Sequence, residues 1–96
     1  MVVHIVMFKF KEENKSENII KVKAELEALT DKIDLLKTME VGVNFNASER
    51  SMDLSLYSTF ENEEDLQAYA VHDEHLKVLS LIKAVIVESK VVDYIY

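Results

Sequence analysis

The stretch Val2-Val3-His4-Ile5-Val6-Met7-Phe8-Lys9-Phe10 decides the fold of this chain. It is rich in β-branched and aromatic residues, which favour a strand, and alternate residues of a strand point to opposite faces of a sheet. One face carries Val2, His4, Val6, Phe8 and Phe10. The opposite face carries Val3, Ile5 and Met7. Because both faces are apolar, the fold must cover this strand on both sides.

The next segment has the pattern of an amphipathic helix. Its apolar residues recur at alternating steps of three and four, at Ile19, Val22, Leu26, Leu29 and Ile33. Such a stripe is typical of a helix that packs one face on a core. Asn14 followed by Glu17 resembles a capping box, and Ser16 is an alternative N-cap. We therefore expect the helix to begin near residue 15 and to end near Asp34.

Two strands with alternating polarity follow and predict a hairpin. Apolar residues of the first strand share one buried face, at Met39, Val41, Val43 and Phe45. A polar turn over residues 46–51 separates it from the second strand. There the residues of one face are Leu54, Leu56, Ser58 and Phe60. Period-two alternation around a polar turn is the usual pattern of a hairpin.

The last third of the chain predicts a bent helical region and a closing strand. Asn62 is a suitable N-cap, and the acidic residues 63–65 suit the positive end of a helix. The inward face is formed first by Leu66, Tyr69 and Ala70, and beyond the histidines by Leu76, Leu79, Ile82 and Ile86. The helical spacing of these apolar residues is interrupted near residues 72–74, where we expect a bend. Residues 91–96 predict the final strand, with apolar groups on both sides.

The order β-α-β-β-α-β over residues 1–96 predicts a single α+β domain with a ferredoxin-like fold. Right-handed crossovers place both helical regions on one face of a four-stranded antiparallel sheet. The other face then exposes Val3, Ile5, Met7 and one side of residues 91–96. A contiguous apolar patch of this kind usually marks an interface. We therefore expect a homodimer that packs sheet against sheet.

Composition narrows the classes of function. The 96 residues carry a formal net charge of −7, which disfavours nucleic acid and acidic membrane surfaces as partners. The first residues lack the charged region and cleavage site of a signal peptide. No apolar stretch reaches the roughly 20 residues of a membrane span, because Lys83 interrupts the longest candidate. The absence of cysteine suits a reducing compartment. We expect a cytoplasmic protein.

The residues able to carry chemistry are three histidines and a tyrosine, His4, Tyr69, His72 and His75. A histidine has an unperturbed pKa of about 6.5 and serves as a base at neutral pH, whereas tyrosine stays protonated and donates a hydrogen bond. Six residues on an unbroken helix separate Tyr69 and His75 by about 120°, so only a bend brings them together. We expect His72, which lies in that bend, to stabilise it.

A metal site is the competing interpretation of the same histidines. His72 and His75 are one turn apart, and His4 could supply a third nitrogen, as in three-ligand zinc sites. Asp73 or Glu74 could then support the ligands. An H-x-x-H spacing alone is weak support, however, and the chain has no cysteine. We therefore assign neither a metal nor another cofactor.

Five short motifs in order resemble the stress-responsive A/B barrel family, also called the Dabb domain. They are H-I-V-x-F-K-F at residues 4–10, E-V-G-x-N at 40–44, x-F-E at 59–61, L-x-x-Y-x-x-H-x-x-H-L at 66–76 and V-V-D-Y at 91–94. The resemblance covers nearly the whole chain. It implies a dimeric α+β barrel of two ferredoxin-like subunits, which agrees with the two-sided first strand.

The resemblance also implies candidate site residues. Many members have no assigned activity, one plant member is a boiling-stable stress protein, and another, olivetolic acid cyclase, closes a linear polyketide by an aldol condensation. By position, the base of that cyclase corresponds to His75, its tyrosine to Tyr69, and a pocket histidine to His4. Two positions depart from the pattern. Asp73 stands where the family commonly has proline, and Leu54 stands where the cyclase has a further histidine.

Three functions remain open at this point. The preferred one is a protein of unassigned activity that binds a small apolar or aromatic ligand between helices and sheet, in a pocket lined by His4, Tyr69 and His75. The first alternative is a cyclase-like or isomerase enzyme, with His75 as general base and Tyr69 as its partner. The second alternative is a structural stress protein that acts through oligomeric assembly.

Overall fold

The computed structural model describes residues 1–96 and has the predicted order of strands and helical regions. The strands are β1 (Val2–Phe10), β2 (Thr38–Val43), β3 (Leu54–Phe60) and β4 (Ile86–Ile95). The helices are α1 (Lys15–Ala28), α2 (Glu63–Ala70) and α3 (Asp73–Val85), and a short 3₁₀ turn, η1 (Leu29–Asp31), extends α1. None of the helices combines the length and the apolar character that crossing a bilayer requires.

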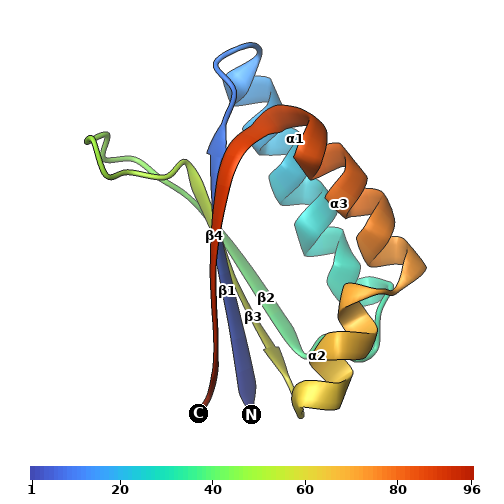
Figure 1. The fold of residues 1–96 in the computed structure, drawn as a ribbon. Coiled ribbons are helices and arrows are strands. Elements are labelled where there is room, and N and C mark those ends of the chain that lie inside the picture. The colour runs from blue at the N-terminus through green and yellow to red at the C-terminus, as the bar shows by residue number, and fades with distance from the viewer.

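The sheet has the strand order β2-β3-β1-β4, and every neighbouring pair is antiparallel. All three helices lie on one face of the sheet, and the opposite face carries no helix (Figure 1). This arrangement confirms the ferredoxin-like α+β fold. Both chain termini lie at the end of the sheet near α2 (Figure 1), and the backbone N–H of Tyr96 donates to the carbonyl of Met1 at 2.9 Å.

The hydrophobic core lies between the helices and the helix-facing side of the sheet. The apolar stripe predicted for the first helix is confirmed, because Val22 and Leu26 are buried in α1 and the stripe continues through Leu29 and Ile33. From the sheet, the largest buried side chains are those of Phe10 and Phe60. The core thus forms around the two strands at the centre of the sheet.

Two details of the last third differ from the prediction. The final strand begins at Ile86, not near residue 91, so Ile86 belongs to β4 and not to a helix. The buried face of α3 also differs from the predicted one, since Leu76, predicted to point inward, is 44% exposed. The residues that reach the core are Val78, Leu81, Ile82 and Val85. The apolar residues of α3 lie on two different sides of the helix, so periodicity alone could not predict which side is buried.

Several expectations for the first half of the chain were also wrong. Val3, expected on the exposed face of the sheet, is 1% exposed, and Val43, expected on a buried face, is 48% exposed. Phe45 is 99% exposed, because β2 ends at Val43 and the loop after it projects away from the helices (Figure 1). Asn14 makes no side-chain capping bond, and its backbone instead adopts the left-handed conformation with φ 54°. By contrast, Asn62 caps α2 as predicted, since its Oδ1 accepts from the backbone N–H of Asp65 at 2.8 Å.

Asn62→Ala is expected to lower the free energy of unfolding by about 1 kcal/mol, because an orphan N–H of the first turn of α2 loses its acceptor. Urea denaturation followed by circular dichroism measures the change. Asn14→Gly is the control and should change stability by less than about 0.5 kcal/mol, because glycine tolerates the left-handed backbone and no capping bond is lost. Equal losses in both variants would contradict the capping role of Asn62.

Candidate functional site

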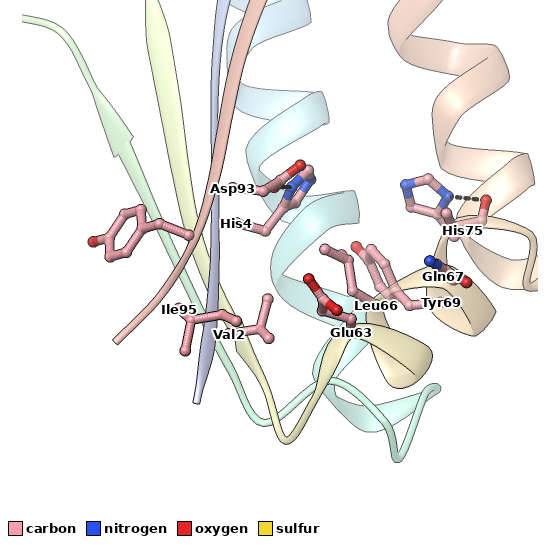
Figure 2. A pocket seen from close by; sticks show the side chains of 11 residues that line it. Val2, His4, Glu63, Leu66, Gln67, Tyr69, His75, Asp93 and Ile95 are labelled. Carbon is pink, nitrogen blue, oxygen red and sulfur yellow. Dashed lines mark hydrogen bonds and ion pairs between the residues drawn. The ribbon is translucent and has the colours of Figure 1, made fainter.

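An open cleft of about 720 Å³ lies between the β1–β4 edge of the sheet and the α2–α3 junction. Figure 2 shows it from close by. Its apolar lining consists of Val2, Leu66, Tyr69, Ala70, Tyr94 and Ile95. Its polar lining consists of His4, Glu63, Gln67, His75 and Asp93. The cleft therefore brings together all three residues predicted from the sequence for a pocket, namely His4, Tyr69 and His75.

His75 presents one free ring nitrogen to this cleft. Its Nδ1 lies 2.9 Å from the backbone oxygen of Ala70, and because a carbonyl only accepts, Nδ1 carries the hydrogen. In the neutral imidazole, Nε2 is then unprotonated, and it points towards the cleft (Figure 2). Burial lowers the pKa of His75 below its ordinary value of 6.5, and the nearby His4 and His72 lower it further. The group is therefore a neutral base at pH 7.

Tyr69 supplies a hydroxyl without a partner in the protein. Its ring packs between Phe60, at a centroid distance of 4.9 Å, and His75, at 4.5 Å. The hydroxyl makes no hydrogen bond within the chain and points into the cleft between the two imidazoles (Figure 2). Burial raises the pKa of Tyr69 from 10.0 to about 12. The phenol therefore remains protonated and can donate to a bound molecule.

The predicted bend is confirmed and explains how Tyr69 and His75 meet. Helix α2 ends at Ala70 and α3 begins at Asp73, so the two residues are not on one continuous helix. His72 is the N-cap of α3, where its Nδ1 accepts from the backbone N–H of Glu74 at 3.1 Å. Asp73, at the position where the family commonly has proline, does not prevent the bend.

His72 does not line the cleft, and no group of three or more histidine or acidic side chains is arranged to hold a metal ion. Leu54, which stands where the cyclase has a further histidine, is buried in the core and does not line the cleft. The polar groups available to a ligand come from β1, β4, α2 and the first turn of α3.

Asp93 is a site residue that the sequence did not reveal. It lies directly opposite His4 in the β1–β4 register, and its Oδ1 accepts a hydrogen bond from Nδ1 of His4. This bond orients the His4 ring and fixes its tautomer, so that the neutral ring carries its hydrogen on Nδ1. Asp93 stands in the V-V-D-Y motif, but its role depends on the strand register, which no local pattern specifies.

Glu63 and Gln67 were also missed. They occupy the first and second turns of α2, and both line the cleft. Gln67 follows Glu63 by four residues, and Ala70 follows Gln67 by three. Residues at these spacings share one face of a helix, so the sequence pattern could have indicated them. The carboxylate of Glu63 points towards the space below His4 (Figure 2).

A ferredoxin-like sheet with helices on one face and a histidine–tyrosine cleft at one end defines a class of small α+β proteins with a ligand-sized cavity. Within that class, the family assignment is direct. The model of the stress responsive A/B barrel domain (Dabb) matches residues 2–96, and the chain belongs to this family.

Three similar proteins illustrate the range of the family and of the fold. The stress-response A/B barrel domain-containing protein At5g22580 of Arabidopsis thaliana is 30% identical over 94 residues, which cover 95% of this chain and 82% of the relative. A dimeric protein of unknown function from Bacteroides fragilis has a TM-score of 0.90 at 33% identity, with 99% and 95% of the two chains covered. A hydroxynitrile lyase from Passiflora edulis shares the fold at a TM-score of 0.88 and 18% identity, with coverage of 99% and 92%.

Proposed function

We propose that this protein binds a small apolar or aromatic molecule in the cleft and holds a carbonyl or hydroxyl group of that molecule between Tyr69 and His75. The observation that carries the proposal is the unpartnered Tyr69 hydroxyl, which faces the same cleft as the free Nε2 of His75. The Tyr69 hydroxyl can donate a hydrogen bond to the bound molecule, and Nε2 of His75 can accept one. The cavity volume of about 720 Å³ lies within the range of roughly 300–1,000 Å³ that small-molecule sites occupy.

The open cleft favours ligand binding over a purely structural role. A protein that acts only through assembly has no use for an unfilled cavity, and side chains would be expected to fill the space. Here apolar walls from Val2, Leu66 and Ile95 surround polar groups that have unused hydrogen-bonding capacity. This combination is typical of a ligand site.

The second candidate is an enzyme that moves a proton next to a carbonyl group, and the neutral state of His75 favours it. Nε2 of His75 takes the proton from the carbon beside the carbonyl, while the Tyr69 hydroxyl donates to the oxygen as it becomes an enolate. Return of the proton at another carbon completes an isomerisation. Alternatively, the enolate carbon attacks a second carbonyl of the same molecule and forms a carbon–carbon bond, and the proton held by Nε2 of His75 passes to the new alkoxide to complete a cyclisation.

Two copies of the chain pair through the helix-free face in this proposal. In the register of the sheet, Ile5 lies between Tyr57 and Val92, and Val3 lies beside Tyr94. Tyr57, Val92 and Tyr94 are all exposed in the single chain. An apolar surface of this kind favours association, and the Bacteroides fragilis relative with the same fold is described as dimeric.

A screen of small aromatic ketones, phenols and alcohols by thermal shift tests the binding proposal. Ligands at about 100 times their Kd should stabilise the wild type by about 2.7 kcal/mol, and His75→Ala should weaken their binding about tenfold because a hydrogen bond is lost. Lys77→Ala is the control, since Lys77 lies on the same helix outside the cleft. Stabilisation that survives unchanged in His75→Ala would remove His75 from the site.

A further inference from the structure

We propose that the cleft selects its ligand by charge, so that it accepts uncharged or amine-bearing molecules and rejects carboxylates and phosphates. This inference rests on the proposed ligand-binding function and specifies its substrate class. The lining contains two carboxylates, Glu63 and Asp93, and no lysine or arginine. An anion that enters the cleft therefore meets two carboxylates and no lysine or arginine.

The lysines with identified ion-pair partners do not line the cleft and do not compensate for this imbalance. Lys15 pairs with Glu12 and Asp53, and Lys23 pairs with Glu27. Lys32 and Lys77 both pair with Glu74, and Lys90 pairs with Glu88. None of these acidic partners lines the cleft. The formal net charge of the whole chain, −7, adds a field of the same sign around the opening. An anionic ligand is therefore disfavoured both at the entrance and at the lining.

Glu63 is the residue that distinguishes ligands by charge. Asp93 is engaged by His4, whereas the Glu63 carboxylate makes no ion pair or hydrogen bond within the chain and points into the cleft (Figure 2). The start of α2 offers no alternative anion site. Its first turn carries three acidic residues, and the Asn62 side chain already accepts from the N–H of Asp65. A ligand ammonium group can therefore pair with Glu63, and a ligand carboxylate is repelled.

Three aromatic probes of nearly equal shape test the inference: phenylacetate, phenylacetamide and 2-phenylethylamine. Their Kd values are measured at pH 8 and low salt by NMR titration of the full chain. We expect the amine to bind most tightly, the amide next, and the carboxylate about tenfold more weakly than the amine, because each exposed charge pair changes affinity by a few fold. High salt should narrow these differences because it screens exposed charges.

Glu63→Gln and Glu64→Gln form a matched pair of variants. Both remove one negative charge from the first turn of α2, but only Glu63 lines the cleft. Glu63→Gln should reduce the ratio between the carboxylate and amine Kd values to about threefold, whereas Glu64→Gln should leave it at the wild-type value. This comparison separates a local effect from the effect of net charge.

The possible results separate this inference from the binding proposal. Equal or tighter binding of phenylacetate in the cleft overturns the charge selection and leaves the binding function standing. If Glu63→Gln and Glu64→Gln reduce the ratio of the carboxylate and amine Kd values equally, the charge selection by Glu63 is also overturned, since the effect would then come from net charge. If none of the three probes shifts the resonances of Tyr69, Ala70 or His75, both the charge selection and the binding function are overturned.

Discussion

Val92→Lys is expected to separate the proposed dimer into monomers. Val92 is 51% exposed in the single chain and lies beside Ile5 on the helix-free face. A lysine there must bury its charge against an apolar surface, which costs roughly 2 kcal/mol. A symmetric dimer contains the substitution twice, so the dissociation constant should rise on the order of 1,000-fold. Sedimentation equilibrium at micromolar concentration measures the change.

Val91→Lys is the matched control for this prediction. Val91 is the neighbouring residue on the same strand and is 61% exposed, but it pairs with Val6 and so lies on the helix side of the sheet. This variant should remain a dimer. Circular dichroism establishes that both variants are folded. A monomeric wild type, or equal dissociation of the two variants, would contradict dimerisation through the helix-free face.

The sequence was sufficient to predict most of the fold, because periodicity identifies the faces of its elements. The alternation in β3 indicated which residues reach the core, and the steps of three and four in α1 did the same. In β1 the alternation was less reliable, because Val3, assigned to the exposed face, is buried. The prediction failed where two patterns competed. Leu76 and Val78 are both apolar residues of α3, and only the tertiary packing determines that Val78 is the buried one.

The candidate site was predictable only in part, for a physical reason. His4, Tyr69 and His75 could be singled out because few other residue types exchange or donate protons near neutral pH, and the slip in apolar phase indicated the bend. Glu63 and Asp93 could not be singled out in a chain with 18 acidic residues. Their roles depend on which side chains face the cleft, which follows from strand register and helix rotation.

His75→Gln is expected to lower kcat/KM for proton exchange by roughly 10²–10⁴-fold if the protein is an enzyme, because the base is lost. The probe is an uncharged aromatic ketone, 4-phenylbutan-2-one, in D2O, and NMR follows the loss of its α-hydrogens. In the wild type the rate should increase with pH as His75 loses its proton. Since burial lowers the pKa of His75, the midpoint of this increase in rate should lie below pH 6.5. The rate should then stay constant into the alkaline range, because the pKa of Tyr69 is about 12.

His72→Asn is the control that separates chemistry from helix geometry. Asparagine is also a good N-cap, so this variant removes an imidazole from outside the cleft while it preserves the start of α3. It should exchange protons at the wild-type rate at alkaline pH, and its pH profile should move slightly upward, because one of the smaller influences that lower the pKa of His75 is removed. If His75→Gln keeps the wild-type rate and profile, His75 is not the base. If both variants lose exchange equally, the loss reflects the bend. Only a loss confined to His75→Gln supports proton transfer at Nε2, because the two variants differ in whether the missing imidazole faces the cleft.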